Sequence, residues 1–151
     1  MSVESGRNKI AWVEQYMPIL KEIKKDFEKN QYFKGIRITM CIHLEAKTAY
    51  LATVLKAGGA EVTATGCNPL STQDDVCEAL REYGITVNAK HGVTMEEYFN
   101  DLRKSLENKP QLVIDDGGDL TAIIHDEMPE LCETLYGATE ETTTGVMRHR
   151  A

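Results

Sequence analysis

Three carboxylates stand within five positions of the segment 113–121, at the point where an apolar run gives way to a polar one: Asp115, Asp116 and Asp119. The glycines between them allow the backbone to approach a ligand closely. Crowded carboxylates repel one another, so at least one should resist ionisation, which suits a group that transfers protons. Capping of the following helix is the competing explanation for Asp119. A cap needs only one carboxylate, so Asp116 is the candidate for chemistry.

A second candidate is His43, which ends a β-rich run of residues. A lone histidine at a strand end is more often structural than catalytic. Glu45 and Lys47 follow it at two-residue steps and form either an ordinary ion pair or a hydrogen-bonding surface. The sequence contains no His-Glu-x-x-His, Gly-x-Ser-x-Gly or Gly-x-Gly-x-x-Gly motif. The residues alone therefore predict a ligand-binding domain with a candidate acid–base pair.

The last dense polar motif is Glu-Glu-Thr-Thr-Thr-Gly at residues 140–145. By composition alone, Thr142, Thr143 and Thr144 form either a strand edge or a helix-capping run. Residues 146–151 then resemble the first turns of a helix that nothing ends. A natural domain rarely stops inside an element, so the pattern indicates a truncated chain.

The elements that must position these residues follow from periodicity. Apolar residues recur at three- and four-residue steps over residues 9–29, which predicts an amphipathic helix that Pro18 kinks or divides. The predicted strands are 36–43, 61–67, 85–89 and 112–114, and the later predicted helices are 46–56, 73–83, 95–107 and 119–127. Strand–helix units of this length predict an α/β fold, a parallel sheet with helices on both faces, as in a Rossmann-like domain.

Ligands of such sheets bind outside the carboxyl ends of the strands. That rule selects the loops 43–48, 67–75, 91–92 and 115–119, three of which are crowded with polar and charged groups. It also places His43 and Asp116 on the same edge of the predicted sheet.

Composition narrows the class of protein. The 151 residues are 42% hydrophobic and 27% charged, which is ordinary for one folded domain. A net charge of −7 counts against a nucleic-acid partner, and the apolar runs are too short to span a membrane. Cys41, Cys67, Cys77 and Cys132 form no Cys-x-x-Cys pair and follow no secretory segment. We therefore expect reduced thiols in a cytoplasmic protein and no metal site, with Cys41 and Cys67 as small buried residues.

Taken together, several segments resemble the S-adenosylhomocysteine hydrolase family. They are, in order, residues 17–18, 34–38, 41–43, 59–62, 67–68, 71–74, 115–121 and 140–146. The segments Asp-Asp-Gly-Gly-Asp-Leu-Thr and Glu-Glu-Thr-Thr-Thr-Gly are the most specific, and the likeness extends from about residue 7 to the end. The resemblance implies that residues 1–151 are the amino-terminal part of a substrate-binding domain, without the NAD-binding domain.

The resemblance also implies an activity, the hydrolysis of S-adenosylhomocysteine or S-inosylhomocysteine to a nucleoside and homocysteine. In the family, a tightly bound NAD oxidises the ribose 3′-hydroxyl, the resulting ketone acidifies the 4′ C–H, and homocysteine leaves from C5′. The complete enzyme would be a homo-oligomer whose partner is the small nucleoside thioether. This chain alone should hold no NAD, be inactive, and leave apolar surface uncovered.

The family's roles carry over to matching positions. His43 and Asp116 would be the acid–base groups around the 5′ leaving group, and Glu141 would bind the ribose hydroxyls. The threonines at 142–144 would approach the nicotinamide end of the cofactor, and Asp119 would shape the loop.

The chain departs from the family at the loop that contacts the base. Glu45 and Lys47 stand where the common form has a threonine and a glutamate. A carboxylate accepts and a lysine donates, which matches N1–H and O6 of hypoxanthine rather than N1 and N6 of adenine. The alternative is that Glu45 and Lys47 pair with each other and leave an adenine to backbone groups.

Two other functions stay open at this point. The chain could be a nucleoside-binding module without catalysis, or a subunit that pairs with a separately encoded cofactor domain. Translation of the gene beyond Ala151 would separate both from a truncated hydrolase.

Overall fold

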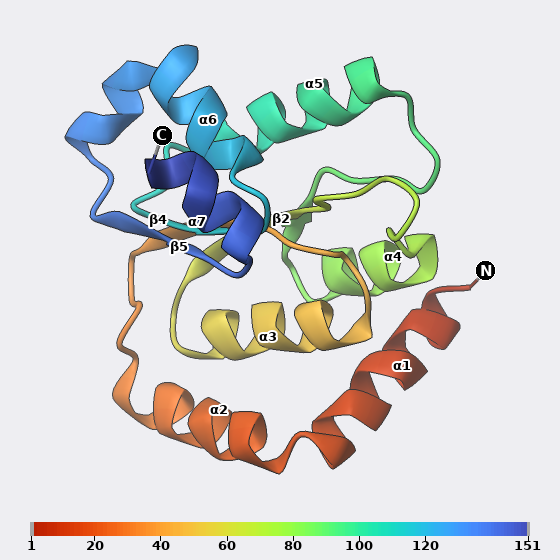
Figure 1. Cartoon of the computed structure of the whole chain (residues 1–151). Helices are drawn as coiled ribbons and strands as arrows, with labels where there is room; N and C mark the ends of the chain where they lie inside the picture. Colours follow the sequence, from red (N-terminus) through yellow and green to blue (C-terminus); the bar gives the residue numbers. More distant parts are fainter. Residues whose placement is uncertain (1, 151) are drawn as a thin grey trace.

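The sheet has five parallel strands in the order β3-β2-β1-β4-β5 (Figure 1), in a computed structural model that describes residues 2–150. The strands are β1 (Arg37–Cys41), β2 (Glu61–Thr65), β3 (Thr86–Val87), β4 (Leu112–Asp115) and β5 (Gly137–Glu140). The α-helices are α1 (Val3–Tyr16), α2 (Pro18–Asn30), α3 (Ala46–Ala57), α4 (Asp74–Glu82), α5 (Met95–Leu106), α6 (Asp119–Asp126) and α7 (Thr143–Arg150). The α/β fold is thus confirmed.

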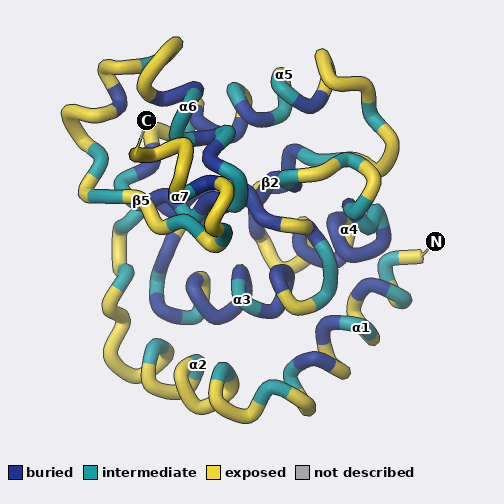
Figure 2. Tube along the Cα trace, in the orientation of Figure 1, coloured by how far each residue is buried: buried dark blue, intermediate teal, exposed yellow. Residues whose placement is uncertain are grey.

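The helices cover both faces of the sheet. On one face α3 packs against β2 and α4 against β3, and α1 and α2 form an outer layer over them. On the other face α5 packs against β1 and β2, and α6 packs against β4. Each face has its own hydrophobic core, built around Met40, Tyr50 and Leu80 on the first and around Leu102, Leu120 and Ile124 on the second. The strands β1 and β2 are buried apart from their first residues, whereas Figure 2 shows α2 exposed along much of its length.

The predicted amino-terminal helix is two helices. It begins at Val3 rather than at residue 9, and Met17 separates α1 from α2, with Pro18 as the first residue of α2. Proline suits this position because its missing N–H has no partner in the first turn anyway. Gly6 lets α1 approach α4, because a Cβ there would lie 2.0 Å from the carbonyl oxygen of Asp75.

The order of strands reverses between β1 and β4. The chain runs outward from β1 through β2 to β3 and then returns to place β4 on the other side of β1. In the register of this pair, Cys41 lies opposite Asp115. The residues that follow these two strands therefore emerge side by side, at the position where open α/β sheets bind ligands.

The carboxyl-terminal third differs most from the prediction. A 3₁₀ helix, η1 (Pro129–Glu133), and the strand β5 were not expected, because β5 has the sequence Gly-Ala-Thr-Glu and no buried residue. The terminal helix was expected, but it begins at Thr143 rather than at residue 146. None of the helices within residues 2–150 combines the length and apolar character needed to cross a bilayer.

Candidate active site

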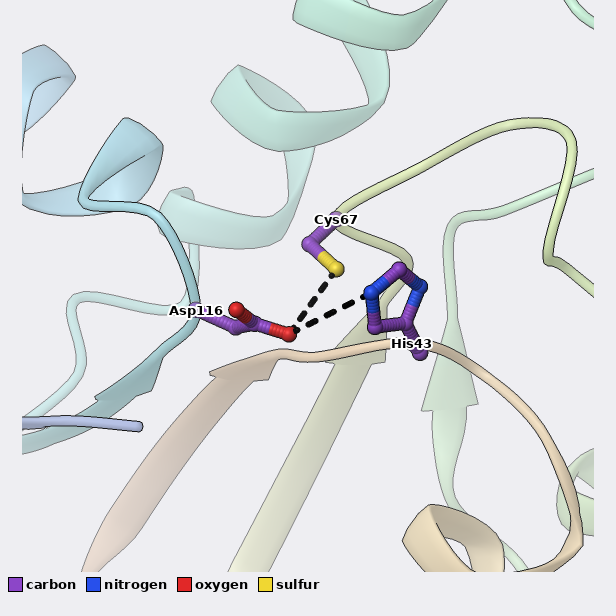
Figure 3. Close-up of side chains that lie close together, drawn as sticks. All are labelled: His43, Cys67 and Asp116. Atoms are coloured by element: carbon purple, nitrogen blue, oxygen red, sulfur yellow. Dashed lines mark hydrogen bonds and ion pairs between the residues drawn. The ribbon is translucent and has the colours of Figure 1, made fainter. Parts of the chain in front are cut away.

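His43 and Asp116 meet at the reversal point of the sheet. Nε2 of His43 lies 3.8 Å from Oδ2 of Asp116 (Figure 3), with the histidine side chain 51% exposed and the aspartate 8% exposed. This separation is longer than a hydrogen bond, and a bridging water or a small rotation of the imidazole closes it. The two predicted acid–base groups are therefore brought together, one near solvent and one buried.

The contacts of the His43 imidazole indicate that Nδ1 carries a proton. Nδ1 of His43 lies 2.6 Å from Oγ of Ser71, and that hydroxyl donates its only proton to the carbonyl oxygen of Asn68 at 3.0 Å. Ser71 must then accept from Nδ1–H. Nε2, the other ring nitrogen, is the one that faces Asp116.

Cys67 completes this group and was not predicted to belong to it. Its thiol donates a hydrogen bond of 3.2 Å to Oδ2 of Asp116. Burial, followed by that hydrogen bond and the charge of Asp116, raises the pKa of Cys67 well above its usual range. The expectation of an ordinary small buried residue holds for Cys41 but is wrong for Cys67, which is partly exposed. Its position directly after β2, in a loop selected by the strand-end rule, was the available signal.

Asp115 is the carboxylate that accepts hydrogen bonds from the first turn of α6. Its Oδ2 accepts from the backbone N–H and the hydroxyl of Thr121, both at 2.9 Å, and its Oδ1 accepts from N–H of Asp116 at 3.1 Å. Burial raises the pKa of Asp115 although the bonds from Thr121 oppose this. The fully buried Asp115 thus has a raised pKa, and its cause is burial rather than the expected repulsion among Asp115, Asp116 and Asp119.

The proposed capping role of Asp119 is wrong. The residue before α6 is Gly118, in the left-handed region at φ 78°, and Asp119 is already the first residue of the helix. The Asp119 carboxylate accepts instead from the hydroxyl of Tyr98 at 2.9 Å and from Nη1 of Arg148 at 2.7 Å. It therefore ties α5 and α7 to the loop that contains Asp116.

A cavity of about 450 Å³ lies beside this pair and collects four of the predicted residues. His43, Glu45, Lys47 and Glu141 provide its polar lining. The remaining lining residues are Met17, Leu20, Ile42, Thr48 and Leu51. The volume falls within the range of small-molecule sites, and a largely apolar wall with a few polar groups is their usual composition.

Glu45 has a structural task in addition to its place in the cavity. Its Oε1 accepts from the backbone N–H groups of Lys47 at 3.0 Å and Thr48 at 3.2 Å, which caps α3. Among residues 2–150, no ion pair joins the side chains of Glu45 and Lys47. The alternative in which the two side chains satisfy each other is therefore not the arrangement found.

A larger cavity of about 850 Å³ opens between the start of α1 and the start of α3. It shares Glu45 and Lys47 with the smaller one and adds residues such as Lys9 and Trp12. It does not include His43 or Glu141. Because a reacting ligand needs the acid–base pair within reach, we assign the site to the smaller cavity.

The threonine run begins α7. The hydroxyl of Thr142 accepts from the backbone N–H of Gly145 at 3.0 Å and donates to Oε1 of Glu140 at 2.9 Å. The capping interpretation is thus confirmed for Thr142, and the strand-edge interpretation is wrong because β5 ends at Glu140. Thr143 and Thr144 are exposed in the first turn of α7, and their contact with a cofactor stays a prediction.

A parallel sheet with a reversal point, covered by helices on both faces, defines a Rossmann-like α/β domain, and a cavity lined by His43 lies at the reversal point. The family described as S-adenosyl-L-homocysteine hydrolase matches residues 1–130. The chain belongs to this family.

Curated relatives carry two different names. An adenosylhomocysteinase of Pyrococcus abyssi is 50% identical over 146 residues, which cover 97% of this chain and 35% of the relative. An S-inosyl-L-homocysteine hydrolase of Methanocaldococcus jannaschii is 51% identical over 148 residues, covering 98% of this chain and 36% of the relative. An adenosylhomocysteinase of Thermoplasma acidophilum is 47% identical over 152 residues, with 100% and 37% covered. The chain thus spans about a third of the length of these relatives.

Proposed function

We propose that this chain forms the substrate-binding part of a hydrolase that cleaves the thioether of S-adenosylhomocysteine or S-inosylhomocysteine to a nucleoside and homocysteine. The supporting observation is that His43, Glu45, Lys47 and Glu141 line one cavity, with Asp116 beside it. Family membership supports the reaction class. Relatives of about 50% identity carry both the adenosyl and the inosyl name, so the choice between adenine and hypoxanthine must be argued from the cavity residues.

In this proposal, His43 and Asp116 transfer protons to and from the groups at C5′ of the substrate. The departing homocysteine sulfur needs a proton, and the water that replaces it must lose one. Nδ1 of His43 contacts Ser71 and Nε2 lies 3.8 Å from Asp116, so the pair can share one proton and donate it to the sulfur. The Cys67 thiol, which donates to Asp116, stabilises the ionised form of that carboxylate once the proton has left.

Glu141 would bind the ribose. Glu141 directly follows β5. Its backbone N–H donates to the carbonyl oxygen of Asp115 at 3.0 Å, which fixes its backbone at the cavity edge. An ionised carboxylate only accepts hydrogen bonds, so its two oxygens suit a pair of neighbouring hydroxyl donors. The 2′- and 3′-hydroxyls of a nucleoside are such a pair.

The sequence has no glycine-rich loop for the pyrophosphate of NAD, the cofactor that the family resemblance implies. A pyrophosphate also needs free N–H groups at a helix amino terminus. At α3 the N–H groups of Lys47 and Thr48 donate to Glu45, and at α6 the N–H of Thr121 donates to the carboxylate of Asp115. We therefore propose that the pyrophosphate of NAD is held outside this chain, so the purified chain should retain no NAD after dialysis. Stoichiometric NAD on this chain would contradict the proposal.

A binding experiment tests the assignment of the cavity. Titration of the ¹⁵N-labelled chain with S-inosylhomocysteine and S-adenosylhomocysteine should shift the resonances of residues 43–48, 116–118 and 141. Glu141→Gln should weaken binding about tenfold, the loss expected for one charged hydrogen bond. Trp12→Ala, in the larger cavity, should leave affinity unchanged. Shifts confined to the larger cavity, or no saturable binding of either nucleoside, would overturn the assignment.

A further inference from the structure

Behind the loop that contains Asp116, two buried carboxylates from neighbouring strands face a histidine from the last helix. Asp115 ends β4, Glu140 ends β5, and His149 lies in the last turn of α7. One ligand atom from each lies within 4.8 Å of the other two. Asp115 is fully buried, and the side chains of Glu140 and His149 are 3% and 26% exposed.

One oxygen of this group has no partner. Oε1 of Glu140 accepts from the backbone N–H of Gly117 at 2.8 Å, and from the N–H and hydroxyl of Thr142, both at 2.9 Å. Oε2 is buried and makes no hydrogen bond with any residue from 2 to 150. Nε2 of His149 lies 3.9 Å from Oε2, which is too far for a hydrogen bond. An unpaired buried carboxylate oxygen is costly, so its presence points to a ligand.

The charges around the group favour a cation. Asp115 and Glu140 end neighbouring parallel strands, and both side chains are buried. The nearby guanidinium of Arg148 is engaged with Asp119 at 2.7 Å. Among residues 2–150, the one ion pair that either carboxylate forms is the long contact between Glu140 and His149. A cation would therefore offset the charge of two adjacent buried carboxylates.

We propose that Asp115, Glu140 and His149 bind a divalent transition-metal cation. One imidazole nitrogen with two carboxylate oxygens is a donor set that Zn²⁺ accepts, with water in the fourth position. Tetrahedral ligands about 2.1 Å from the metal lie about 3.4 Å apart. The atoms of this group must therefore close by a small inward movement, which the partly exposed His149 on the surface helix α7 can supply.

The group is accessible from solvent. His149 borders a cavity of about 620 Å³, which is also lined by Thr121, His125 and Arg148. A hydrated ion can therefore reach the imidazole first and the two buried carboxylates after it.

A cation bound by these three residues would stabilise the loop that contains Asp116 and Gly117. Asp115 already accepts from the N–H of Asp116, and Glu140 accepts from the N–H of Gly117. Fixing both carboxylates to α7 would join β4, β5 and α7 around that loop. The sequence predicted no metal site because its cysteines show no metal-binding spacing. These ligands come from three separate elements.

Zn²⁺ titration of this chain in a Cys67→Ala background tests the proposal. The background substitution is needed because His43, Cys67 and Asp116 are a second group of metal-ligand types. We expect one Zn²⁺ per chain and a higher melting temperature in its presence. His149→Ala and Glu140→Gln should each weaken binding at least tenfold. His125→Ala, which removes a histidine of the same cavity outside the group, should change it less than twofold.

The decisive variant is His149→Ala, because its side chain is partly exposed and its removal leaves the two strands intact. Circular dichroism should show an unchanged fold for it. No saturable Zn²⁺ binding in the Cys67→Ala chain would overturn the proposal. So would a His149→Ala chain that binds Zn²⁺ as tightly as its parent.

Discussion

Nε2 of His43 lies 3.8 Å from Oδ2 of Asp116, although His43 follows β1 and Asp116 follows β4. The two are neighbours because the chain returns from β3 to place β4 beside β1. Ser71 contacts the far side of the imidazole and Cys67 contacts the carboxylate, so the loop after β2 orients both members of the pair. The predictions below follow from this arrangement and from the cavity beside it.

The base preference of the complete hydrolase should be for hypoxanthine. Lys47 donates only and Glu45 accepts only, which matches O6 and N1–H and opposes the edge of adenine. A buried polar mismatch costs about 1–3 kcal/mol per group, so two mismatches predict a preference on the order of tenfold to thousandfold. The measurement is kcat/KM for S-inosylhomocysteine against S-adenosylhomocysteine.

A double variant provides the control for this prediction. Glu45→Thr with Lys47→Glu should reverse the preference while α3 keeps its cap, because threonine also caps helices. A wild-type enzyme with a clear preference for the adenosyl substrate would contradict the prediction and leave the family assignment intact.

The thiol of Cys67 should be unreactive because of Asp116. Burial and the adjacent carboxylate raise the pKa of Cys67, so little thiolate forms at neutral pH. Iodoacetamide should label the exposed Cys132 first, as followed by mass spectrometry of the peptides. Asp116→Asn removes the opposing charge and should speed the labelling of Cys67. An unchanged or slower rate in that variant would show that the carboxylate does not control this thiol.

The junction of α1 and α4 should lose stability in acid. The fully buried side chain of Asp75 accepts from Ser5 at 2.7 Å and pairs with Lys9 at 2.8 Å. Burial raises the pKa of Asp75, but these partners outweigh it and the net pKa is lowered. A lowered folded pKa gives stability that is complete above the unfolded value of about 3.9 and disappears as pH falls through the folded value.

Asp75→Asn should therefore lower the free energy of unfolding by about 1.5–3 kcal/mol at pH 7, the range for hydrogen bonds to charged groups. The difference from wild type should shrink below about pH 4 in urea titrations. Lys25→Met, which breaks an exposed pair with Glu22, should change stability by less than about 0.5 kcal/mol at either pH. A difference for Asp75→Asn that is constant from pH 7 to pH 3 would contradict this account.

Most strands and helices could be predicted because more than one sequence signal marks each of them. The strands around Met40 and Val113 are apolar runs between turn signals, and four of the five strands were expected at these places. The strand β5 could not be predicted, since Gly137 and Ala138 bury little and its pairing with β4 comes from the tertiary structure. An interruption at Pro18 was expected as a kink or a division, and the structure has the division.

The site was predictable only where it follows strand ends. The rule placed His43 and Asp116 at one edge of the sheet. The roles of Glu141 and of the proposed base-contacting residues Glu45 and Lys47 were predicted from the family resemblance. Cys67 was missed because a lone cysteine carries no spacing signal. The capping by Asp115 and the burial of Glu140 depend on how three elements pack, which the linear sequence does not show.

Proton transfer by His43 and Asp116 is the central proposal, and homocysteine release by the complete hydrolase tests it most directly. His43→Asn and Asp116→Asn should each lower kcat roughly 10²–10⁴-fold, the usual range for general acid–base groups. The dissociation constant for substrate should change little, which separates a chemical role from a structural one. Near-normal kcat in both variants, or a loss that appears only as weaker substrate binding, would contradict the account.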